Sequence, residues 1–144
     1  MKKISAIISA VVLLMIWTAY VSDAADKTPE QMVSEAKASI KEVTPAFTKA
    51  IMDAKEKIIV LDVRDKQEFD EGHISGAINI SRGMLEFKTS LIMPDKDSRI
   101  IVYCGVDLRG PLATKTLNEL GYRNAVNMLG GLKAWKEAGL PIAK

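Results

Sequence analysis

The sequence contains little cysteine, little histidine and little excess of either charge. One cysteine and one histidine among 144 residues exclude an intramolecular disulfide, a multi-thiolate metal site and a structural zinc site. The 20 basic residues nearly balance 18 acidic ones, and the formal net charge of +2 leaves no basic footprint for nucleic acid. The chain is too short for several domains, and its 48% apolar and 26% charged residues predict one compact unit.

The first 24 residues have the three-part pattern of a secretory signal peptide. Two lysines precede an apolar run over residues 6–17, and small residues flank the expected cleavage site after Ala24. We therefore expect an exported bacterial protein in the periplasm. The alternative is an uncleaved membrane anchor, because the 19 charge-free residues 4–22 approach the roughly 20 that span a bilayer. Contact with a membrane is expected only in that case.

Two helix starts follow the signal. Residues 28–31 have the sequence Thr-Pro-Glu-Gln, which supplies a hydroxyl cap, a proline at the first helical position and an amide at the third. Residues 25–40 are therefore expected to form a helical lead-in. Thr44-Pro45 begins a second helix, for which the spacing predicts Phe47 and Ile51 on the inner side.

The remaining chain alternates short apolar runs with helical patterns. The expected strands are at residues 58–61, 77–80, 100–103 and 125–129, and the expected helices are at about 84–92, 111–121 and 132–138. Continuous apolar runs such as Ile-Ile-Val-Tyr at 100–103 are typical of strands covered on both faces. The alternation predicts an α/β fold, with a mostly parallel sheet and helices on both faces. In such a sheet, chemistry is expected at the carboxyl ends of the strands.

The only cysteine follows one of these strands. Cys104 is followed by a tight loop over residues 105–110, and a helix is expected to begin at Pro111. Backbone N–H groups of such a loop, together with the helix dipole, favour an anion and therefore a nucleophilic thiolate. Arg109 adds a permanent positive charge. The alternative is a buried cysteine that only fills space in the core.

Several separated motifs resemble the rhodanese-like sulfurtransferases, from about Lys41 to Pro141. They are Leu61-Asp62-Val63-Arg64 with Glu68-Phe69, Gly72-His73-Ile74 with Gly76-Ala77-Ile78-Asn79-Ile80, the Cys104 loop, and Gly130-Gly131-Leu132-Lys133-Ala134-Trp135. The resemblance implies a rhodanese-like domain over residues 41–144, with a five-stranded sheet. It implies no cofactor and no metal.

The resemblance also implies a mechanism. Cys104 would accept a sulfane sulfur from thiosulfate, polysulfide or a persulfide donor, and pass it to cyanide or a thiol. The N–H groups of the loop would hold the persulfide, and the loop residues are Gly105, Val106, Asp107, Leu108, Arg109 and Gly110. Two alternatives stay open, namely a sulfur-delivery module with little activity on small donors and a scaffold whose cysteine is incidental.

The length and composition of the loop bear on its substrate. Four residues separate Cys104 from Arg109, whereas the related phosphatases and arsenate reductases have five, so the resemblance favours sulfur over phosphate. Asp107 stands where many members have glycine, and Gly110 stands where they have alanine or a small hydroxyl residue. An inward Asp107 carboxylate would repel thiosulfate by about 1 kcal/mol at about 4 Å in water, whereas an outward one would cost little.

Other polar residues are weaker candidates. Asp62 at a strand end and Arg82 after the third strand are candidate accessory residues of the pocket, with structural or solvent-exposed roles as the alternatives. The spacing of Arg64 and Glu68 predicts a structural ion pair. His73 is expected to be structural, because a thiolate stabilised by its loop needs no base.

Overall fold

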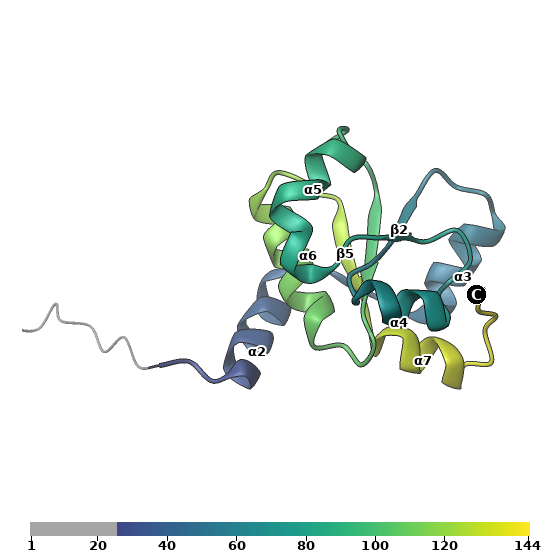
Figure 1. Cartoon of the computed structure of the whole chain (residues 1–144), viewed down its shortest axis with the longest axis horizontal. Coiled ribbons are helices and arrows are strands. Elements are labelled where there is room, and N and C mark those ends of the chain that lie inside the picture. The colour runs from purple at the N-terminus through teal and green to yellow at the C-terminus, as the bar shows by residue number, and fades with distance from the viewer. Residues whose placement is uncertain (1–25) are drawn as a thin grey trace, which may run out of the picture.

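The computed structural model describes residues 26–144 (Figure 1). The predicted signal peptide and its cleavage site lie outside these residues. Within residues 26–144, no helix is both long and apolar enough to cross a membrane.

A five-stranded sheet forms the centre of the protein. Its strands are β1 (Glu42–Val43), β2 (Ile59–Asp62), β3 (Ile78–Asn79), β4 (Ile100–Tyr103) and β5 (Ala125–Met128). They lie in the order β1-β5-β4-β2-β3, and every neighbouring pair is parallel. The predicted α/β class with a parallel sheet is confirmed.

Helices follow or precede each strand. They are α2 (Pro29–Ser39), α3 (Pro45–Asp53), α4 (Lys66–Glu71), α5 (Leu85–Ile92), α6 (Arg109–Glu119) and α7 (Gly131–Glu137), with a 3-10 turn at Arg82–Met84. Thr28 caps α2 in the predicted capping box, and Thr44 caps α3. The sequence analysis missed α4 as a helix, although an Asp65–Glu68 capping box marks its start.

One helix boundary and the position of one side chain differ from the prediction. Helix α6 begins at Arg109, two residues before Pro111, so that the arginine belongs to the first helical turn. Phe47 is 49% exposed, and its predicted inner position is wrong. The buried side chains of α3 are Thr48, which directly follows Phe47, and Ile51, whose predicted inner position is confirmed.

The core has two layers, one on each face of the sheet. Successive residues of β4 point to opposite faces, so Ile100 and Val102 pack with Cys104 towards α5 and α6. Ile101 and Tyr103 pack on the other side with Trp135 of α7. Figure 1 shows α5 and α6 on one side of the strands and α3 and α7 on the other. Cys104 directly follows β4, which is the central strand of the sheet.

Candidate active site

The candidate site lies at the carboxyl end of β4. Cys104 directly follows this strand and is 1% exposed. Residues 105–108 form bends without hydrogen-bonded turns, and α6 begins at Arg109. No acceptor within residues 26–144 takes the N–H groups of residues 105–108. The first N–H groups of α6 have no partner within the helix, as at every helix start. These donors can bind a negative charge beside the Cys104 sulfur.

Helix α7 fixes the beginning of this loop. The N–H of Leu132 donates to the Cys104 carbonyl at 2.7 Å, and the N–H of Lys133 donates to the Gly105 carbonyl at 3.0 Å. Gly131, with φ of +60°, allows this approach, because a Cβ there would lie 2.5 Å from the Cys104 carbonyl oxygen. The Gly130-Gly131 pair of the sequence therefore has a physical role at the site. It lets the start of α7 donate hydrogen bonds to the carbonyl groups of Cys104 and Gly105.

Arg109 closes the loop through an ion pair with α4. Its Nη1 and Nη2 atoms donate to the two Glu68 carboxylate oxygens at 2.6 and 2.8 Å. The hydrogen bond with Glu68 raises the pKa of Arg109 and lowers the pKa of Glu68. Arg109 is thus held by an anion that belongs to the protein, and its geometry suits the maintenance of loop shape. Glu68 was not recognised as part of the site.

The predicted Arg64–Glu68 ion pair is wrong. Arg64 instead binds Asp62, with Nε and Nη2 donating to the carboxylate at 2.7 to 3.0 Å. The Arg64 Nη2 atom also donates to the Gly72 carbonyl at 2.8 Å. Asp62 is the last residue of β2, and its Oδ1 also accepts the N–H of Arg64, which lies two residues later in the bend after the strand. Because Asp62 is fully buried, these contacts give it a structural role at the strand end.

Arg82 and His73 each form contacts with neighbouring structural residues. Arg82 donates to Glu86 at 3.0 Å and to Thr116 of α6 at 3.0 Å, about two helical turns beyond Arg109. It joins the 3-10 turn to α6. The His73 Nδ1 atom lies 2.9 Å from the Phe69 carbonyl oxygen, and the two rings are stacked. These contacts agree with the structural role expected for His73.

Asp107 has a conformation that the sequence did not reveal. Its φ is +67°, a left-handed conformation that aspartate adopts more readily than most residues. Its side chain is 11% exposed, and it faces α2 and β5. Asp107 Oδ2 accepts from Lys37 Nζ at 2.5 Å, and Oδ1 accepts from Asn127 Nδ2 at 2.7 Å. Neither predicted orientation describes it fully, because the carboxylate is buried and paired.

Gly110 makes room for Asn127. A Cβ at Gly110 would lie 2.5 Å from Asn127 Oδ1. Asn127 is fully buried, and its Nδ2 atom also donates to Glu42 Oε1 at 2.8 Å. Among residues 26–144, no donor reaches its Oδ1 atom. Two residues of the loop, Asp107 and Gly110, are therefore both linked to Asn127.

A cavity of about 360 Å³ opens beside the loop. Gly105 lines it together with Arg64, Leu132 and the end of α7, where Lys133 and Lys136 accompany Glu137. The two lysines were not recognised in the sequence. They place positive charge beside the candidate site, where an anionic donor would approach.

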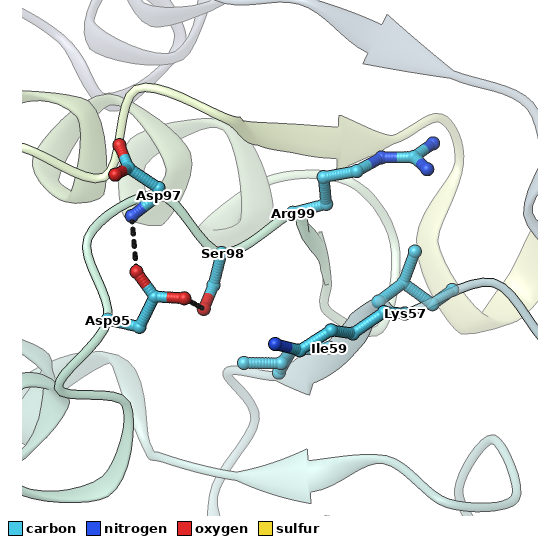
Figure 2. A pocket seen from close by; sticks show the side chains of 7 residues that line it. Lys57, Ile59, Asp95, Asp97, Ser98 and Arg99 are labelled. Carbon is cyan, nitrogen blue, oxygen red and sulfur yellow. Dashed lines mark hydrogen bonds between the residues drawn. The ribbon is translucent and has the colours of Figure 1, made fainter.

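A different cavity lies at the opposite edge of the sheet. It has a volume of about 240 Å³ and is lined by residues around the starts of β2 and β4. Figure 2 shows Asp95 bonded to Ser98 and to the N–H of Asp97. Both carboxylate oxygens of Asp95 therefore accept hydrogen bonds from residues of the same turn. This cavity lies at the amino ends of the strands, away from Cys104.

Comparison with known proteins defines the class. A rhodanese-like domain model matches residues 44–138, and the chain belongs to that family. The thiosulfate sulfurtransferase GlpE of Haemophilus influenzae is 34% identical over 105 residues, which cover 72% of this chain and 95% of that protein. The putative sulfur carrier protein YrkF of Bacillus subtilis is 28% identical over 102 residues, 71% of this chain. This chain spans only 54% of the length of YrkF.

Solved structures support the fold. A Rhodopseudomonas palustris protein of unknown function, described as a possible tyrosine phosphatase, superposes with a TM-score of 0.77 at 31% identity. The alignment covers 83% of this chain and 97% of that one. The polysulfide-sulfur transferase homodimer of Wolinella succinogenes has a TM-score of 0.67 at 32% identity, covering 77% and 83%. The fold is rhodanese-like, and the relatives include sulfurtransferases.

Proposed function

We propose that the protein is a sulfurtransferase that moves a sulfane sulfur through a persulfide on Cys104. The donor is thiosulfate, polysulfide or a low-molecular-weight persulfide, and the acceptor is a thiol or cyanide. The observation that supports this proposal is the set of N–H groups in the bends that follow Cys104, which find no acceptor in the described part of the chain. These groups are suited to a persulfide anion, which has one more sulfur atom than the thiolate.

The two half-reactions need no external oxidant or reductant. The Cys104 thiolate attacks the outer sulfur of thiosulfate, the S–S bond of the donor breaks, and sulfite leaves with the bonding electron pair. An acceptor thiolate or cyanide then attacks the outer sulfur of the persulfide. The Cys104 thiolate leaves, and the product is a new persulfide or thiocyanate. Negative charge is present at the loop throughout, which is where the N–H groups lie.

Loop length favours sulfur over phosphate, despite the description of one structural neighbour as a possible tyrosine phosphatase. Four residues separate Cys104 from Arg109, one fewer than in the related phosphatases. Arg109 is also bound to Glu68 at 2.6 and 2.8 Å. A phosphate group would require both a wider loop and a guanidinium that is free to bind its oxygens.

A sulfur-delivery module with little activity on small donors is the second candidate. Two observations favour it: Cys104 is 1% exposed, and Arg109 is paired with Glu68. The relative YrkF is named a sulfur carrier. In this alternative, Cys104 accepts and releases sulfur only against a dedicated protein partner.

Intact mass spectrometry tests the function. We expect the protein to gain the mass of one sulfur atom after incubation with thiosulfate or polysulfide, and to lose it after treatment with cyanide. Cys104→Ser should never gain it. Full sulfur transfer by Cys104→Ser would refute the mechanism. Rapid loading from polysulfide with negligible turnover of small donors would favour the delivery module.

We also propose that this activity is periplasmic, on the basis of the predicted signal peptide. N-terminal sequencing of protein recovered from a periplasmic fraction should give Ala25 as the first residue. Recovery of uncleaved protein in the membrane fraction would support the anchor instead.

A further inference from the structure

The lead-in helix α2 lies outside the segment matched by the family model, which begins at residue 44. It nevertheless packs against α6, the helix that begins at the end of the Cys104 loop, and Figure 1 shows the two helices side by side. Ala36 of α2 is fully buried. The helix is thus placed to affect the loop, although the family motifs do not include it.

Lys37 of α2 forms an ion pair with Asp107 of the loop. Its Nζ atom lies 2.5 Å from Asp107 Oδ2, while Asp107 Oδ1 accepts from Asn127. The hydrogen bond with Asp107 is the main cause that raises the pKa of Lys37. Lys37 therefore binds the carboxylate of the loop that follows Cys104.

The balance of charge in this cluster depends on Lys37. Glu42 Oε1 lies 4.0 Å from Lys37 Nζ and 2.8 Å from Asn127 Nδ2. Two carboxylates, 11% and 23% exposed, thus share one lysine and one amide. Without the lysine, both anions would depend on a neutral amide group. A poorly solvated carboxylate without a cationic partner is strongly unfavourable, and its charge would repel an anion that approaches Cys104.

We propose that Lys37 is a positioning residue of the sulfur site, which neutralises Asp107, holds it towards α2 and β5, and so permits anionic donors to reach Cys104. The inference rests on the proposed sulfurtransferase function. Lys37 compensates for the charge that Asp107 brings to the loop. Helix α2 is then a functional part of the active site.

Kinetics of Lys37→Met test this role. We expect the KM for thiosulfate to rise about fivefold, equivalent to about 1 kcal/mol, while kcat and the KM for neutral dimethyl trisulfide stay within twofold. Lys37→Arg should retain the wild-type KM. Lys27→Met is the matched control, because Lys27 is exposed and pairs with Glu35 on the surface. Adding Asp107→Gly to Lys37→Met should abolish the fivefold penalty.

Alkylation of Cys104 gives a readout that does not depend on sulfur transfer. The ratio of its rates with anionic iodoacetate and neutral iodoacetamide should fall about fivefold in Lys37→Met and recover when Asp107→Gly is added. If folded Lys37→Met keeps both the wild-type ratio of alkylation rates and the wild-type KM for thiosulfate, the proposed role of Lys37 is wrong. The proposed sulfurtransferase function would not be affected by that result. If neither reagent labels the wild-type thiol and no donor loads it, the sulfurtransferase function itself is refuted.

Discussion

Arg109, at the end of the Cys104 loop, is bound in a two-point ion pair to Glu68 of α4, with distances of 2.6 and 2.8 Å. The two residues are 41 positions apart in the sequence. Helix α4 thereby fixes one end of the loop, while α7 binds the carbonyl groups at the other end. The loop is held from both sides, which fixes the positions of its N–H groups. Such preorganisation is what stabilises developing charge without a reorganisation cost.

The Glu68–Arg109 pair should stabilise the fold in a pH-dependent way. Arg109 lowers the pKa of Glu68 below 4.5, so the stabilisation is present above this value and is lost as the pH falls through the lowered pKa. Because both side chains are more than one-third exposed, we expect Glu68→Gln to cost at most about 1 kcal/mol at neutral pH.

Urea unfolding at neutral pH and at about pH 3 measures this effect. The difference between wild type and Glu68→Gln should shrink as the pH falls towards and through the lowered pKa of Glu68. Glu119→Gln is the matched control, since Glu119 forms an exposed pair with Lys115. A stability difference that grows at low pH would contradict the assignment.

Gly131 should be intolerant of a side chain because of where α7 meets the loop. A Cβ at this position would lie 2.5 Å from the Cys104 carbonyl oxygen. We expect Gly131→Ala to cost about 2 to 3 kcal/mol of unfolding free energy through backbone strain and the clash, and to lower the rate of persulfide formation at least tenfold.

Gly139 provides a control for the backbone component of that cost. Its φ is +70°, close to the +60° of Gly131, but a Cβ there would have no atom within 4 Å. Gly139→Ala should therefore show the cost of positive φ alone, about 1 kcal/mol, with normal persulfide formation. Equal losses of stability and activity in the two variants would show that the contact with Cys104 is unimportant.

Asp62 provides a test that separates a structural role from a catalytic one. Asp62 and Arg64 form a buried ion pair, with side-chain exposures of 0% and 7%. Asp62→Asn should cost about 3 to 5 kcal/mol, because it leaves the Arg64 charge without its partner. At a temperature where the variant is folded, circular dichroism and turnover measured together should show near-normal kcat. A stable Asp62→Asn variant with strongly reduced kcat would instead assign it an accessory role in catalysis.

Features that depend on residues close together in the sequence could be predicted from the sequence. The continuous apolar run of β4 identified a buried strand, and the position of Cys104 after it placed the candidate site at the carboxyl end of that strand. The spacing rule that paired Arg64 with Glu68 failed because Asp62 had already bound Arg64 in the bend after β2. Once Arg64 is occupied, Glu68 is free to bind Arg109 from the loop.

Contacts between distant segments could not be found in this way. Lys37 and Asp107 are 70 positions apart, and Asp107 and Asn127 are 20 apart. Only the parallel sheet and the packing of α2 on α6 bring them together. The unusual residues of the loop were visible in the sequence, but the buried amide that they accommodate was not.

Gly110 and Asn127 should therefore be energetically coupled. In Gly110→Ala, the new Cβ would meet Asn127 Oδ1 at 2.5 Å and displace the amide that donates to Asp107 and Glu42. We expect this variant to lose about 1 to 3 kcal/mol of unfolding free energy, as in other overpacked cores. Asn127→Ala alone also loses stability, because it removes both hydrogen bonds.

A double-mutant cycle measures the coupling. Asn127→Ala removes the Oδ1 atom that the new Cβ at position 110 would meet. In that background, Gly110→Ala should therefore reduce the free energy of unfolding by at least about 1 kcal/mol less than it does in the wild type. Gly83→Ala is the control for adding a methyl group, because a Cβ at Gly83 would have no atom within 4 Å. Additive losses would mean that the methyl group at position 110 is accommodated without moving Asn127, and that glycine at this position is not required by the amide.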